Sequence, residues 1–76
     1  MNRFMIEHHL RYNIYPPVTA EMVPYCIDAI DKVSCGLSHW EIDFPNGDSI
    51  PAGQIVEDLH LEDFVEENSL QFHMED

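Results

Sequence analysis

The fold is decided by residues 19–48, which read TAEMVPYCIDAIDKVSCGLSHWEIDFPNGD. In the first half of this stretch, apolar residues recur at spacings of three and four, the period of a helix that buries one face. Thr19 is a good N-cap, Pro24 is tolerated only near a helix start, and Gly36 suits the left-handed residue that follows a helix. We predict a helix that begins at Thr19 or restarts at Pro24 and ends before Gly36. Its buried face comprises Val23, Cys26, Ile27, Ile30 and Val33.

The second half of the stretch changes to a period of two, which is typical of a half-buried strand. We predict this strand at residues 39–44, followed by a tight turn at residues 45–48, Pro-Asn-Gly-Asp, and a short returning strand at Ser49 and Ile50. The alternation places Trp40, Ile42 and Phe44 on one face and Glu41 and Asp43 on the other.

After Pro51 the apolar residues fall into two sets. At about 100° per residue, one continuous helix would put these sets on opposite sides and expose one of them. We therefore predict a helix from about Pro51 to Leu59, a break near His60 and a short second helix from about Leu61 to Glu67. The first set is Ile55, Val56 and Leu59, and the second is Leu61, Phe64 and Val65.

The two ends of the chain are less clearly patterned. Residues 3–15 fit both a strand and a helix with an apolar stripe, and their content of Met, Glu, Leu and Arg favours a helix through about Arg11. Pro16 and Pro17 end that segment. The helical stripe consists of Met1, Phe4, Met5, His8, Tyr12 and Tyr15. The alternating tail, residues 69–76, is either a third strand beside residues 40–44 or a frayed end.

These elements predict the fold class α+β. We expect one small globular domain at residues 1–68, with three to four short helices and a β-hairpin, and a C-terminal tail at residues 69–76. A chain of 76 residues buries only about 60% of its unfolded surface, so its core is thin. Whether the domain is a monomer or closes its core as a homodimer is left open by the pattern.

Charge is distributed very unevenly along the chain. The net charge is −12, yet no lysine or arginine follows Lys32, whereas eleven carboxylates follow it. The first 40 residues contribute −1 and residues 41–76 contribute −11. A surface of one sign repels nucleic acid and anionic membranes and attracts basic protein surfaces.

No catalytic or metal-binding motif is recognised, and we expect no enzymatic activity, cofactor or metal. Adjacent side chains on a helix or strand diverge, so His8 and His9 cannot easily share an ion, and we expect His8 at the edge of the core with the other histidines on the surface. Cys26 and Cys35 would lie about 13 Å apart along one helix, which predicts two reduced thiols. We expect a cytoplasmic protein, because no signal peptide or membrane span is apparent.

The acidic half predicts a binding function. Carboxylates on a helix can pair with the lysines and arginines that normally hold phosphates, so we expect an inhibitor or regulator of a basic, nucleic-acid-handling protein. In size and charge the chain is similar to small acidic bacteriophage inhibitors of restriction, CRISPR or polymerase enzymes, which act as DNA mimics. The expected partner-binding residues are Glu41, Asp43, Glu57, Asp58, Glu62, Asp63, Glu66 and Glu67.

Two alternatives use other surfaces. In the first, the acidic face is only solvated, and the chain is an interaction module that binds through residues 12–17 or through strand addition by its tail. In the second, Arg11 and the neighbouring tyrosines hold a small nucleotide. Direct binding of nucleic acid is not expected, because only three cations are present.

Overall fold

The computed structural model describes residues 3–15 and 17–66, and within them a long central helix organises the other elements. The elements follow in the order α1 (Arg3–Tyr12), α2 (Val23–Ser34), β1 (Glu41–Asp43), β2 (Ser49–Pro51) and α3 (Ala52–Asp58), and a further helical turn covers residues 62–66. The predicted small α+β domain with short helices and a hairpin is confirmed. The predicted tail at residues 69–76 and its third strand lie outside the described residues.

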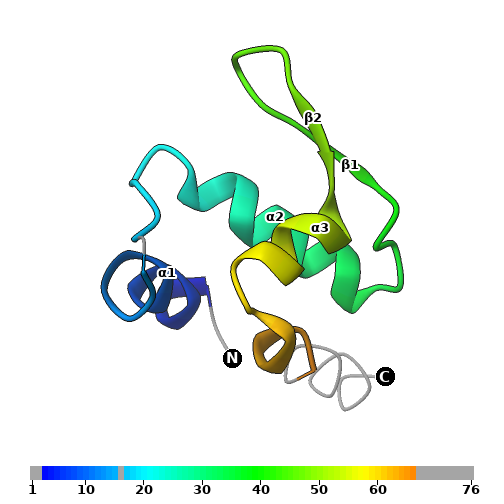
Figure 1. Ribbon diagram of the computed structural model, residues 1–76. Coiled ribbons are helices and arrows are strands. Elements are labelled where there is room, and N and C mark those ends of the chain that lie inside the picture. The colour runs from blue at the N-terminus through cyan, green and yellow to red at the C-terminus, as the bar shows by residue number, and fades with distance from the viewer. Residues whose placement is uncertain (1–2, 16, 67–76) are drawn as a thin grey trace.

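Helix α2 lies in the middle of the molecule and packs most extensively on α3 (Figure 1). Helix α1 lies against one end of this pair, the hairpin extends away from it on one side, and residues 62–66 lie on the opposite side (Figure 1). Between these elements lies one apolar core, made of Ile6, Leu10, Val23, Cys26, Ile27, Ala29, Ile30, Ile42, Ala52, Ile55, Val56 and Leu61. It contains no buried polar or charged residue among those described.

The start of α2 matches the second of the two predicted alternatives. The helix begins at Val23 with Met22 as its N-cap and Pro24 in its first turn, and no side chain caps it. Thr19 contributes only its backbone, since its carbonyl oxygen accepts hydrogen bonds from the Met22 and Val23 N–H groups (3.0 and 3.2 Å). The turn at residues 20–22 therefore leads into the helix.

The end of α2 is a Schellman motif with the predicted glycine. Gly36 has φ +81°, in the left-handed region that glycine enters without steric cost. The Leu37 N–H donates to the Lys32 carbonyl oxygen (2.8 Å), and the Gly36 N–H donates to that of Val33 (2.9 Å). These two bonds are accepted by carbonyl groups of the last helical turn, and they turn the chain towards the hairpin.

The hairpin forms as predicted, although β1 is shorter than residues 39–44. Ile42 is opposite Ile50 in the antiparallel register, and its side chain is buried. Gly47 has φ +96°, and the Asp48 N–H donates to the Asn46 side-chain oxygen (2.9 Å). The predicted inward position of Trp40 is wrong, because its side chain is 49% exposed. Trp40 precedes the strand, where its N–H donates to the Leu37 carbonyl oxygen (2.9 Å), so the alternation does not extend to it.

The start of α3 is held against the segment before β1. The Ala52 N–H donates to the Trp40 carbonyl oxygen and the Gly53 N–H to that of Ser38, both at 2.7 Å. A Cβ atom at Gly53 would lie 3.1 Å from both Cβ and the carbonyl oxygen of Ser38. A side chain at position 53 would therefore require Ser38 to shift by a few tenths of an ångström.

Helix α1 confirms the predicted helix but not its apolar stripe. The buried residues are Ile6 and Leu10, whereas Phe4, Met5 and Tyr12 are exposed. The Val18 N–H donates to the Leu10 carbonyl oxygen (2.9 Å) and draws the loop after α1 back against the helix. No helix within the described residues is long and apolar enough to cross a membrane.

Candidate partner-binding surface

Strand β1 holds the first two predicted binding residues. Strand alternation turns Ile42 into the core, so Glu41 and Asp43 on either side of it are exposed. The Ser49 hydroxyl on β2 donates to Asp43 Oδ1 (2.5 Å), which fixes that carboxylate across the hairpin. Both carboxylates are therefore presented on the outer face of the sheet.

Helix α3 holds two further predicted binding residues, Glu57 and Asp58. Ile55 and Val56 are buried against α2, and the two residues that follow, Glu57 and Asp58, are exposed. Gln54 Nε2 donates to Asp58 Oδ1 (2.8 Å), one helical turn away. This bond orients Asp58 and leaves its other oxygen open to a donor from a partner.

The predicted break near His60 is confirmed, and it has the geometry of a second Schellman motif. The Leu61 N–H donates to the Val56 carbonyl oxygen (2.9 Å), and the His60 N–H donates to that of Glu57 (3.1 Å). His60 has φ +55°, so a histidine takes the left-handed position that glycine takes after α2. Leu61 is then completely buried.

The helical turn after the break, residues 62–66, holds the last predicted binding residues that the structure describes. Glu62, Asp63 and Glu66 are exposed, while Phe64 and Val65 on the same helical turn are partly buried against the core. Three of the four carboxylates predicted on this outer face thus share it, and Glu67 lies outside the described residues.

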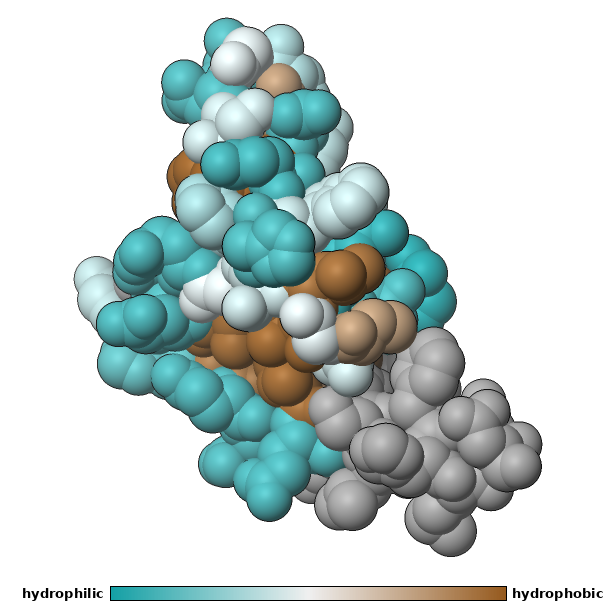
Figure 2. All heavy atoms as spheres, turned by 90° about the vertical axis from the view of Figure 1, so that its right-hand side faces the viewer, coloured by the Kyte–Doolittle hydropathy of each residue, from teal (hydrophilic) through white to brown (hydrophobic). Residues whose placement is uncertain are grey.

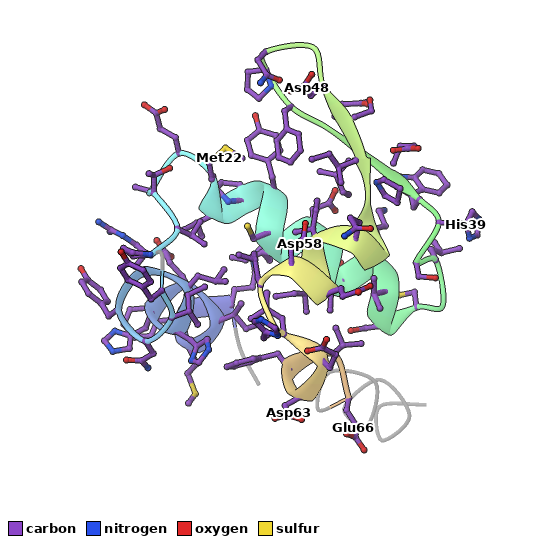
Figure 3. The ribbon with its side chains drawn as sticks, viewed as in Figure 1. Met22, His39, Asp48, Asp58, Asp63 and Glu66 are labelled. Atoms are coloured by element: carbon purple, nitrogen blue, oxygen red, sulfur yellow. The ribbon has the colours of Figure 1, made fainter. Side chains whose placement is uncertain are left out.

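The exposed carboxylates are spread along the domain and do not form one compact patch. We call this set the acidic array: Glu41, Asp43, Asp48, Glu57, Asp58, Glu62, Asp63 and Glu66. Figure 3 shows Asp48 at the tip of the hairpin, Asp58 at the middle of the molecule, and Asp63 and Glu66 at the opposite end. Because the chain changes direction at His60, the carboxylates of α3 and of residues 62–66 do not lie along one straight helix. A partner that contacts all of them has to follow the whole length of the domain.

Few cations are available to neutralise this array. Lys32 Nζ lies 5.2 Å from the centroid of the Trp40 ring, which places the last cation of the sequence over an aromatic face. Among residues 17–66, no ion pair is formed by the carboxylates of the array. These carboxylates are exposed, and no described cation neutralises them.

Two features of the described residues bear on catalysis, a cleft and the two cysteines. A shallow apolar cleft runs between the loop before α2, the hairpin and α3, and it is lined by Pro17, Val18, Met22, Cys26, Phe44, Ile55, Asp58 and Leu59. Burial raises the pKa of the Cys26 thiol to about 11, which disfavours the nucleophilic thiolate. Both cysteines are free thiols, as predicted, and no group of three metal-ligating side chains is found in the described part of the chain.

The predicted position of His8 at the core edge is wrong. His8 is exposed, and it is His9 that is partly buried, with its ring 4.3 Å from that of Phe64 (centroid to centroid). Since α1 buries Ile6 and Leu10, the residue between them that turns inward is His9, three positions after Ile6.

Sequence reasoning did not identify the exposed aromatic residues of α1 as surface. Phe4 and Tyr12 were predicted on the helical stripe that, in the structure, faces outward. The signal that was available is that Ile6, Leu10 and Ile14 form a second stripe at spacings of four, made only of aliphatic residues. Figure 2 shows another face, where most side chains of the hairpin are hydrophilic and the largest hydrophobic area lies in the middle.

Comparisons of the chain with protein-family models, with curated proteins and with solved structures found no match.

Proposed function

We propose that this chain is a small, non-enzymatic binding protein that inhibits or regulates a basic, nucleic-acid-handling protein. The observation that supports the proposal is the array of exposed carboxylates, which form no ion pair with a cation of the described residues. It consists, within the described residues, of Glu41, Asp43, Asp48, Glu57, Asp58, Glu62, Asp63 and Glu66.

The physical basis is competition for cations. A protein that binds nucleic acid carries lysines and arginines matched to the phosphate charge, one per about 1.7 Å of duplex axis. Carboxylates pair with the same side chains through charge-assisted hydrogen bonds. A domain that covers such a channel keeps the nucleic acid out, which is the mode of action of a DNA mimic of the bacteriophage type, and it requires no catalytic group.

The bend at His60 refines this proposal. Glu57 and Asp58 precede the bend, and Glu62 and Asp63 follow it, so the two groups face a partner at different angles. We therefore expect the partner to present its cations inside a cleft or channel.

The test is an affinity capture from a bacterial lysate with this protein as bait, eluted with NaCl from about 0.1 to about 1 M, where screening removes most surface charge interactions. A variant with Glu62→Gln, Asp63→Asn and Glu66→Gln removes three charges from the array. A matched control with Glu21→Gln, Asp28→Asn and Asp31→Asn removes three exposed charges from the loop before α2 and from α2.

We expect a nucleic-acid enzyme to be retained by the wild type and the control, to elute at high salt, and to be lost by the array variant. Duplex DNA added to the purified complex should displace the protein from that enzyme. Retention that does not change with salt, or loss with both variants alike, contradicts the proposal.

A further inference from the structure

The outward side of α1 and the turn that follows it carry large aromatic side chains that are exposed. Phe4, Tyr12 and Tyr15 are 76%, 65% and 95% exposed. Of the large hydrophobic residues that are exposed in the described chain, only Trp40 lies outside residues 4–15. Aromatic side chains carry roughly 150–250 Å² each, so these three alone expose on the order of 400 Å². The largest apolar patch of a typical monomer has an area of this order, and such patches are often functional.

A row of charged residues runs beside the aromatic residues. Arg3, Glu7 and Arg11 recur at spacings of four, so they form one ridge along α1, next to the ridge of Phe4, His8 and Tyr12. Glu7 and Arg11 are exposed, and together with Phe4, His8 and Tyr12 they line a shallow depression on the helix surface. Arg11 stacks near the Tyr12 ring at 5.5 Å from its centroid.

We propose that α1 is the interface of a symmetric homodimer. In this dimer, α1 packs antiparallel against α1 of a second copy, and Glu7 of each copy pairs with Arg11 of the other. Two-fold symmetry requires a surface that complements itself. In an antiparallel pair the same ridges of the two helices run side by side in opposite directions. With the two-fold axis between Glu7 and Arg11, each Glu7 lies beside Arg11 of the other copy, whereas an axis at Glu7 itself would bring like charges together.

Charge favours a second copy as the occupant of this face. Two chains of net charge −12 repel one another over most of their surfaces, and residues 41–76 carry −11 of that charge. Helix α1 is the exception, because it has two arginines and one glutamate and no other charged residue apart from its histidines. Copies can therefore approach through α1 with the least repulsion.

The apolar area sets the expected affinity. A standard stable interface buries about 800 Å² per partner, and the aromatic residues with their flanking charged residues supply at most about that much. We expect a reversible dimer with a dissociation constant in roughly the micromolar range, which leaves the acidic array on the outside of both copies.

The experiment is sedimentation equilibrium of the full chain over concentrations of about 1 to about 500 µM, a range that brackets that affinity. In Arg11→Glu, the glutamates at positions 7 and 11 of one copy face the same glutamates of the other copy, and in Glu7→Arg arginines face arginines. Each variant alone should therefore dimerise at least about tenfold more weakly. An equimolar mixture of the two variants should dimerise again, because unlike ridges then meet. The double variant with both substitutions should also dimerise.

Two further variants complete the experiment. Phe4→Ser should weaken the dimer by about tenfold or more through loss of apolar burial. Asp28→Arg changes charge by the same amount as Glu7→Arg at an exposed position on α2, and it should leave the dimer intact. Circular dichroism of each variant establishes that the helices are retained.

A wild-type protein that stays monomeric over the whole range overturns the proposal. A dimer that is insensitive to Glu7→Arg and Arg11→Glu, or a mixture that fails to recover, overturns it as well. ATP is included as a probe for the alternative occupant: binding of ATP by a monomer, lost with Arg11→Glu, would assign this face to a nucleotide.

Discussion

The ring of His9 on α1 packs against the ring of Phe64, with centroids 4.3 Å apart and planes tilted by 52°. This contact joins the first helix of the chain to the last described helical turn, which are far apart in the sequence. It complements the aliphatic core contacts of Ile6 and Leu10, which hold α1 against the rest of the domain.

The ring contact should be measurable as a coupling energy. We expect a double-mutant cycle of His9→Ala and Phe64→Ala to give a coupling of about 0.5–1.5 kcal/mol in urea unfolding, as for other aromatic pairs. A control cycle of His39→Ala with Phe64→Ala should be additive, since His39 is exposed on the segment before β1 (Figure 3). Additivity in the first cycle would show that the rings do not stabilise one another.

The two Schellman motifs provide a matched pair of backbone tests. Gly36→Ala should lower the free energy of unfolding by about 1 kcal/mol or more, because a Cβ is disfavoured at φ +81° even though no atom lies within 4 Å of it. His60→Gly should raise it by about 0.5–1 kcal/mol, because relief of the left-handed strain exceeds the added entropy of the unfolded chain. Urea midpoints measure both, and destabilisation by His60→Gly would mean that the histidine side chain has a role of its own.

Leu61 should be the residue after the break on which stability depends most. It is completely buried, so Leu61→Ala should cost about 2–5 kcal/mol, a large part of the roughly 4–11 kcal/mol expected for a chain of this length. Leu59→Ala, at a partly buried position, serves as the control and should cost less. Equal losses in thermal or urea unfolding would contradict the packing described for the break.

The buried thiol predicts a loss of stability at alkaline pH. The pKa of Cys26 is raised to about 11 by burial from an ordinary value of 9.0, so the unfolded chain loses this proton first. The contribution of the thiol is fully present below about pH 9 and is lost as the pH rises towards 11, by about 2–3 kcal/mol. Cys26→Ala should flatten this part of the stability profile.

In the native protein, Cys35 should react with a maleimide at pH 8 and Cys26 should not, because only Cys35 is exposed.

Salt should stabilise the isolated domain. Carboxylates without counterions repel one another, and NaCl screens that repulsion, so the urea midpoint should rise between about 0.05 and about 0.5 M NaCl. The variant with Glu62→Gln, Asp63→Asn and Glu66→Gln should show a smaller rise. A midpoint independent of salt would mean that the carboxylates lie too far apart to interact.

Local patterns were sufficient where one element has one apolar face and a clear end. The α2 stripe with Gly36, the strand around Ile42 and the change of direction at His60 could all be predicted, because spacing and turn residues specify them directly. The left-handed conformation of His60 itself could not, since histidine is not a common residue at that position.

The orientation of α1 could not be predicted, for a different physical reason. Its ten residues carry two apolar stripes, one through Phe4 and Tyr12 and one through Ile6 and Leu10, and only contacts with distant parts of the chain decide between them. The contact of His9 with Phe64 belongs to the same set of distant interactions. The spatial spread of the acidic array likewise depends on how α3 and residues 62–66 pack, which their sequence alone does not specify.

The way in which α1 is attached has a consequence for how the domain opens. Its buried residues are Ile6 and Leu10, His9 contacts Phe64, and two backbone hydrogen bonds, from Asn13 to His9 and from Val18 to Leu10, join it to the residues that follow. Regions with few buried contacts open locally without global unfolding, so the amide protons of α1 should exchange with deuterium before those of α2. Association through α1 would slow that exchange. Hydrogen exchange measured for individual amides would then report dimer formation as protection of α1 alone.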